Sequence, residues 1–142
     1  MKCSEVMTVN PSCCVATDMV YQAAQLMKSE DVGSIPILND PESRRLEGII
    51  TDRDIVLKVV AENRDPKNTR VSEIMTKDVA TCRVNDDAHK ALHLMEEHQV
   101  RRVPIVNDNG QLAGIVSQAD VATRMKEPAM TAEVVKEISR GA

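Results

Sequence analysis

One short pattern occurs twice in this chain of 142 residues, and the repetition limits the folds open to it. Residues 48–54 read glycine, two β-branched apolar residues, a hydroxyl residue, two variable residues and an aspartate, and residues 114–120 follow the same order. An apolar run that ends in Thr/Ser-x-x-Asp is typical of a buried strand that passes directly into a helix, with both polar side chains capping the first turn. Capping alone would explain a single copy, but two copies indicate an internal repeat.

Further matches at an offset of 68 residues extend the repeat. Residues 6–8 recur at 74–76, and an apolar run at 35–38 recurs at 103–106, each with a proline in second place. Such a proline belongs at a sheet edge or at the start of a strand, because it has no N–H to donate. A helical stripe at i, i+3, i+4 and i+7 stays apolar in both copies. Its members are Val20, Ala23, Ala24 and Met27, then Ala88, Ala91, Leu92 and Met95.

Each repeat is therefore predicted to run strand, helix, strand, strand, helix, in an α+β fold. Thr17 or Asp18 is the expected N-cap of the first long helix, and Asn85 or Asp86 that of its counterpart. Polar turns at 39–42 and 107–110 indicate hairpins with return strands at 46–50 and 112–116. The next helix is expected to place Ile55, Val56, Val59 and Val60 on one face, and its counterpart Val121, Ala122 and Met125.

These elements give four predicted segments. Residues 1–63 form the first repeat, 64–70 a polar linker, 71–126 the second repeat, and 127–142 a C-terminal helical extension with an apolar face at Val134, Val135 and Ile138.

Composition excludes several classes of function. Tyr21 is the only aromatic residue, so a module that stacks bases on aromatic rings is not expected. The net charge of -4 argues against binding nucleic acid through a basic surface. No apolar run reaches membrane-spanning length and no signal pattern opens the chain, which favours the cytoplasm. Four cysteines without C-x-x-C spacing are expected to be free thiols: Cys3, Cys13, Cys14 and Cys82.

The doubled pattern resembles the CBS domain family. The resemblance rests on residues 6–8, 32–37 and 48–54 with their second-repeat equivalents, and it covers about residues 1–126. The whole chain looks like a stand-alone bacterial CBS pair, or Bateman module. The resemblance implies that the two repeats pack through their sheets about a pseudo-twofold axis. It also implies two clefts that, in many members, bind adenine nucleotides, S-adenosylmethionine or related adenosyl ligands.

The residues suit such a ligand. A carboxylate can accept both ribose hydroxyls, and Asp54 and Asp120 stand at helix starts. Thr51 and Ser117 can meet ribose or phosphate oxygens beside helix N–H groups. Family members often carry an arginine that contacts phosphate where this chain has Arg102 in one repeat and Ser34 in the other. The expected nucleotide-binding residues are Thr8, Ser34, Ile35, Pro36, Thr51, Arg53, Asp54, Thr76, Arg102, Val103, Pro104, Ser117 and Asp120.

Two other classes of function stay open. His89 and His93 stand i, i+4 on one helix, a spacing that could hold a divalent metal, although a solvated surface is the simpler interpretation. No Gly-rich phosphate loop or nucleophile elbow is present in the sequence, so catalysis is not expected and no cofactor is required. The remaining alternative is a ligand-free interaction protein that acts through its dimer surfaces.

The favoured interpretation is a non-catalytic sensor that binds AMP, ATP, NAD or S-adenosylmethionine and acts on an unidentified protein, without nucleic acid or membrane as a partner. It is expected to form a homodimer by burying apolar helix surface from Val56, Val59 or Val60, and Val121.

Overall fold

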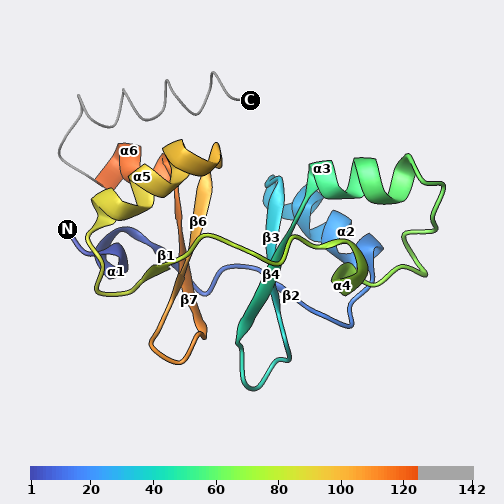
Figure 1. Ribbon diagram of the computed structural model, residues 1–142, viewed down its shortest axis with the longest axis horizontal. Helices are drawn as coiled ribbons and strands as arrows, with labels where there is room; N and C mark the ends of the chain where they lie inside the picture. The colour runs from blue at the N-terminus through green and yellow to red at the C-terminus, as the bar shows by residue number, and fades with distance from the viewer. Residues whose placement is uncertain (125–142) are drawn as a thin grey trace. The chain divides into compact units, whose positions relative to one another are not determined.

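The computed structural model describes residues 1–124 and divides the chain into two compact units (Figure 1). Unit 1 holds residues 1–11 together with the chain from residue 80 onward, and unit 2 holds residues 12–79. Met125 and the predicted C-terminal helix at 127–142 lie outside the described residues. No helix within the described part is long and apolar enough to cross a membrane.

Unit 2 is built on a three-stranded sheet of order β2-β3-β4. Strand β2 runs parallel to β3, and β3 forms a hairpin with β4. The elements in chain order are β2 (Cys14–Val15), α2 (Val20–Glu30), β3 (Ser34–Leu38), β4 (Leu46–Thr51), α3 (Asp52–Ile55), a π-helical turn η1 (Val56–Val60) and α4 (Val71–Ile74).

Unit 1 repeats this arrangement on a four-stranded sheet of order β1-β7-β6-β5. Its elements are α1 (Cys3–Val6), β1 (Thr8–Val9), β5 (Cys82–Arg83), α5 (Ala88–His98), β6 (Arg102–Val106), β7 (Leu112–Ser117) and α6 (Gln118–Arg124). The predicted order of strand, helix, strand, strand, helix is confirmed in both repeats, and so is the α+β class. The short helices α1 and α4 were not predicted.

The predicted apolar stripe faces the core in both units. Val20, Ala23 and Met27 are buried in unit 2, and all four counterparts in α5 are buried in unit 1. The predicted helix starts are wrong by one or two residues, because α2 begins after Met19 and α5 after Asp87. The reason is that the earlier aspartates close the preceding turns: Asp18 accepts the N–H of Val15 at 2.9 Å, and Asp86 accepts that of Arg83 at 2.8 Å.

The first segment of each repeat packs on the other repeat. Thr8 and Val9 of β1 pair antiparallel with Ile115 and Gly114 of β7, within unit 1. In unit 2, Thr76 exchanges both backbone hydrogen bonds with Ile49 of β4, each 2.9 Å long. The compact units therefore do not follow the order of the repeats along the chain.

The repeated glycines permit this exchange of first segments, in which the start of each repeat packs on the sheet of the other repeat. A Cβ atom on Gly48 would lie 2.6 Å from the Thr76 carbonyl oxygen, and one on Gly114 would lie 2.7 Å from that of Thr8. Both distances are too short for any side chain, so glycine lets the exchanged backbone approach the sheet.

Pro36 and Pro104, the repeated prolines, lie in β3 and β6, and each of these strands has a neighbour on both sides. Strand β2 pairs with β3 only from Ile37 onward, so Pro36 lies just past the end of that ladder. Pro104 lies in the same way before the first pairing of β6 with β5 at Ile105. Each proline thus occupies a locally open edge, where its missing N–H costs no ladder hydrogen bond.

The helical face predicted at residues 55–60 is only partly correct. Val59 is buried, whereas Val56 is 54% exposed and Val60 is 68% exposed. The chain forms a π-helical turn here, in which Ala61 donates its N–H to the Val56 carbonyl at 2.9 Å. The wider turn changes the angle between successive side chains, so a stripe counted at 3.6 residues per turn no longer lies on one face.

Gly48→Ala is expected to lower the free energy of unfolding by about 2–3 kcal/mol, the cost of overpacking against a backbone atom that cannot move aside. Gly33→Ala is the matched control, since a Cβ there would meet the flexible Asp52 carboxylate at 3.1 Å. Urea denaturation measures both changes. Equal stability of the two variants would contradict the close backbone approach.

Candidate functional site

The hairpin register places the predicted polar residues opposite one another. Ser34 pairs with Thr51 in unit 2, and Arg102 pairs with Ser117 in unit 1. Directly opposed residues of an antiparallel pair share one face of the sheet, so each hydroxyl of the repeated motif lies beside the first residue of the preceding strand. Pro36 and Pro104, two residues further along their strands, share that face.

In unit 1 the site combines residues that are far apart in the sequence. Asp120 accepts the N–H of Ser117 at 3.0 Å, and the Ser117 hydroxyl accepts the N–H of Asp120 at 3.1 Å. The Thr8 hydroxyl lies 3.2 and 3.3 Å from the two Asp120 carboxylate oxygens and donates to them. The capping box therefore carries a third polar group, from a segment 112 residues away.

Unit 2 contains the equivalent group. Asp54 and Thr51 form the reciprocal capping box, with both bonds at 3.0 Å. The Thr76 hydroxyl donates to Asp54 at 3.4 Å. Each candidate site therefore unites a threonine, a hydroxyl residue and an aspartate that the repeats supply jointly.

A cation four residues after each aspartate distinguishes the two sites. The Lys58 ammonium group lies 3.1 Å from Asp54 and donates to the Ile74 carbonyl at 3.0 Å. The equivalent Arg124 donates to the Val6 and Met7 carbonyls, both at 3.0 Å. Both cations thus cap the short exchanged helix, but only Lys58 also neutralises its aspartate; among residues 1–124, Asp120 has no ion pair.

Some predicted residues do not join these groups through their side chains. Ile35 is 1% exposed and Val103 is fully buried, and both pack in the hydrophobic cores. Only their backbone groups remain available to a ligand. Arg53 is exposed in α3, and its guanidinium forms no ion pair with the described residues.

Sequence reasoning missed Lys58, Arg124 and the steric role of Gly48 and Gly114. A signal was present, because Lys58 and Arg124 are a like-charged pair at the 66-residue spacing of the two glycines. It showed a repeated cation but not the carbonyls that the cation contacts.

The metal alternative named two histidines, which both lie on α5. His89 Nδ1 lies 2.7 Å from the Asp87 carboxylate, and hydrogen bonds from the His89 backbone and ring lower the pKa of Asp87. Within residues 1–124, no group of three or more His, Cys, Asp or Glu side chains is placed to hold a metal ion.

Asp54→Ala is expected to lower the free energy of unfolding by about 2–3 kcal/mol, and Asp120→Ala by about 1 kcal/mol. The difference is expected because only Asp54 pairs with a cation, so its removal also leaves Lys58 without a counter-charge. The Asp54 side chain is 11% exposed. Urea denaturation of both variants tests this difference. Asp52→Ala, at an exposed position, is the control, and equal losses for Asp54 and Asp120 would contradict the role of Lys58.

The chain has relatives along most of its length. It is 37% identical over 126 residues to Hypoxic response protein 1 of Mycobacterium tuberculosis, an alignment that covers 89% of this chain and 86% of the relative. The crystal structure of Hypoxic Response Protein I with two coordinated zinc ions superposes with a TM-score of 0.80 at 35% identity, covering 89% and 100% of the two chains.

Matching solved structures include complexes with adenosyl ligands. The CBS domain protein PAE2072 from Pyrobaculum aerophilum, complexed with AMP, matches with a TM-score of 0.75 and 25% identity over 96% of this chain and 99% of its own. The CBS domain pair of protein MJ0100, in complex with 5-methylthioadenosine and S-adenosyl-L-methionine, matches with a TM-score of 0.74 and 25% identity over 87% and 94%.

The family resemblance proposed from the repeated motif is confirmed by these relatives and by the family match itself. The CBS domain family matches the chain twice, over residues 3–61 and 71–127. The chain therefore belongs to the CBS domain family, with two copies in tandem.

Proposed function

We propose that the chain is a cytoplasmic, non-catalytic regulatory module that binds an adenosyl ligand and alters the activity of a protein partner. The observation that carries this proposal is the meeting of Thr8, Ser117 and Asp120 in unit 1. CBS relatives bound to AMP or to S-adenosylmethionine support the class of ligand. The candidate ligands are AMP, ATP, NAD and S-adenosylmethionine.

The carboxylate is suited to a ribose diol. Asp120 Oδ2 accepts the N–H of Ser117 and shares the Thr8 hydroxyl with Oδ1, so Oδ1 keeps a lone pair that can accept a ribose hydroxyl. The Gln118 side-chain amide nitrogen, next in sequence to Ser117, is buried without a hydrogen-bond partner among the described residues. A ligand acceptor would relieve the cost of this unpaired donor.

Charge favours unit 1 for a phosphorylated ligand. Arg102 stands in register with Ser117, whereas the corresponding position beside Thr51 is Ser34. A guanidinium can grip phosphate with paired hydrogen bonds and stays charged at any working pH. In unit 2, Lys58 already forms an ion pair with Asp54, so the Asp54 carboxylate is less available to a ligand.

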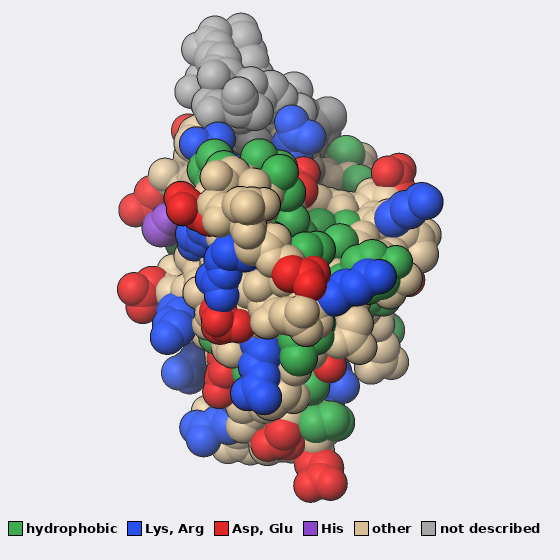
Figure 2. All heavy atoms as spheres, turned by 90° about the vertical axis from the view of Figure 1, so that its right-hand side faces the viewer, with side chains coloured by type: hydrophobic (Ala, Val, Ile, Leu, Met, Phe, Trp, Pro, Cys, Tyr) green, Lys and Arg blue, Asp and Glu red, His purple; other side chains and the backbone are tan. Residues whose placement is uncertain are grey.

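The face drawn in Figure 2 gives no support to a nucleic-acid partner. On the face drawn in Figure 2, Lys and Arg side chains are interspersed with Asp and Glu. This face therefore lacks the continuous basic stripe that binds a polyanion.

Arg102→Ala is expected to weaken AMP binding about tenfold or more while leaving adenosine binding nearly unchanged, since the lost hydrogen bonds go to the phosphate. Calorimetric titration measures both affinities. Arg101→Ala is the matched control, because it removes the same charge from the adjacent exposed position, outside the paired strand. Equal losses for AMP and adenosine would show that Arg102 supports the fold and not the phosphate.

Apolar exposure favours a second candidate, that the chain acts through a homodimer surface. Val56, Leu57 and Val60 are each about half exposed or more on one short helical segment. Val59 and Val121 were predicted to join this surface, but both are buried within their own units. Of the predicted contact residues, Val56 and Val60 remain available, and the exposed Leu57 is added to them.

Light scattering at micromolar concentration is expected to return twice the chain mass of 15.7 kDa. Val60→Glu should shift the mass to that of the single chain, because a charge cannot be buried unpaired in an apolar contact. Val100→Glu, at another exposed valine, should leave the dimer intact. A wild-type mass of 15.7 kDa would exclude this surface as a dimer contact.

A further inference from the structure

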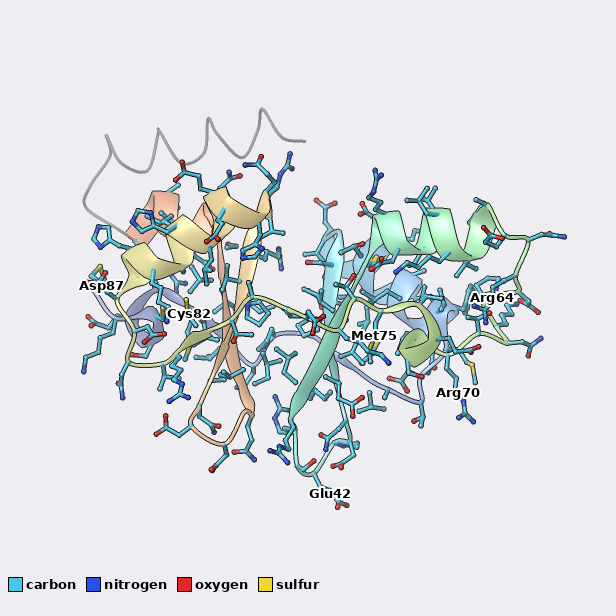
Figure 3. All side chains as sticks on the ribbon, viewed as in Figure 1. Glu42, Arg64, Arg70, Met75, Cys82 and Asp87 are labelled. Carbon is cyan, nitrogen blue, oxygen red and sulfur yellow. The ribbon has the colours of Figure 1, made fainter. Side chains whose placement is uncertain are left out.

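Two cysteines that are far apart in the sequence meet in the core of unit 1. Cys3 is the first residue of α1 and is fully buried, and Cys82 is the first residue of β5 and is 1% exposed. Both belong to the same hydrophobic cluster, and Figure 3 shows Cys82 close to α1. Backbone hydrogen bonds hold the two segments together, from Cys3 to Asp86 at 2.8 Å and from Ser4 to Val84 at 3.0 Å.

The Cys3 thiol donates a weak hydrogen bond to the Asp87 carbonyl oxygen at 3.9 Å, and it also lies close enough to the Cys82 thiol for the two groups to affect each other's ionisation. The contact between the two thiols lowers the pKa of Cys82, with a smaller contribution from Lys90 in the same direction. The same contact, followed by burial, raises the pKa of Cys3. Cys14 in unit 2 provides a contrast, because burial raises the pKa of this thiol to about 12. Cys82 is therefore easier to ionise than its counterpart.

The repeat shows that packing alone does not require this pair. At the repeat offset of 68 residues, Cys3 corresponds to Val71 and Cys82 corresponds to Cys14. Val71 and Cys14 both lie in the core of unit 2. Val71 begins α4 as Cys3 begins α1, and it makes the equivalent backbone hydrogen bond, to Asp18 at 2.8 Å. A valine thus fills the same position in unit 2. The packing of the core therefore does not require a thiol at Cys3.

We infer that Cys3 and Cys82 form a reversible disulfide which fastens the exchanged N-terminal segment to β5 under oxidising conditions. The segment carries Thr8, so the crosslink would secure the part of unit 1 that contacts Asp120. The inference concerns the thiols alone and does not depend on whether the chain binds an adenosyl ligand.

The oxidant is a small disulfide such as oxidised glutathione. The Cys82 thiolate attacks one of its sulfur atoms, which breaks the S–S bond and releases one glutathione thiolate. The Cys3 thiolate then attacks the mixed disulfide and releases the second glutathione. The protein loses two protons and two electrons, and the electrons reduce the glutathione disulfide.

Access to the buried pair comes through local opening of the segment that carries Cys3. The first segment is held by a four-residue helix and a two-residue strand. Such short elements open locally at a lower free energy than the core. Opening exposes both sulfur atoms, and reclosure brings them into contact. The crosslink then restricts the unfolded chain through a long loop between residues 3 and 82.

The test uses the full chain, reduced and then incubated with oxidised glutathione, with free thiols blocked before proteolysis without reductant. Mass spectrometry should find the peptides of Cys3 and Cys82 linked within one chain, with the loss of two hydrogen atoms. The midpoint of thermal unfolding should rise by roughly 5 °C or more, and reductant should reverse the rise.

Cys3→Val copies the natural arrangement in unit 2, so it is expected to fold and to lose both the linked peptide and the rise in midpoint. Cys13→Ser is the control, because it removes a thiol outside the pair and should keep both effects. Only glutathione adducts at these cysteines, or a linked peptide without a change in midpoint, would overturn the inference, as would thiols that stay reduced in the wild type.

Discussion

The close approach of an exchanged backbone segment to each sheet determines the rest of this structure. Thr8 and Thr76 can reach β7 and β4 only because Gly114 and Gly48 have no Cβ atom. The contact completes the sheet face with a segment from the other repeat, and it delivers one hydroxyl to each aspartate. A single-residue constraint in the repeated motif thus couples folding to the assembly of both candidate sites.

The two units share this arrangement but differ in the charged side chains around the aspartate and the motif hydroxyl. Lys58 and Arg124 cap the exchanged helices in the same way, yet only Lys58 also holds its aspartate. The strand position in register with the motif hydroxyl is Ser34 in one unit and Arg102 in the other. These changes leave the backbone intact, because they replace side chains at positions where the core stripe and the glycines already determine the fold. Under the proposed function, unit 1 is therefore the better candidate for a charged ligand.

Periodicity and the internal repeat predicted the elements, the core stripe and the paired capping boxes, since these depend on local spacing. The exchange of first segments was not predictable in this way, because the local pattern of a short segment such as residues 6–8 does not specify which sheet the segment pairs with. The face of residues 55–60 was predicted incorrectly, since counting at 3.6 residues per turn cannot anticipate a π-helical turn. Ile35 and Val103 were predicted among the ligand contacts, and their side chains are buried in the cores, which the apolar runs at 35–38 and 103–106 were already consistent with.

The central claim, that the exchanged segment and the motif of the second repeat form one ligand site, is tested most directly by amide hydrogen exchange with and without AMP. The account predicts that saturating AMP slows exchange together in residues 7–9 and in residues 116–121, although these stretches are far apart in the sequence. Protection of either stretch without the other, or of neither while AMP is bound, would contradict it.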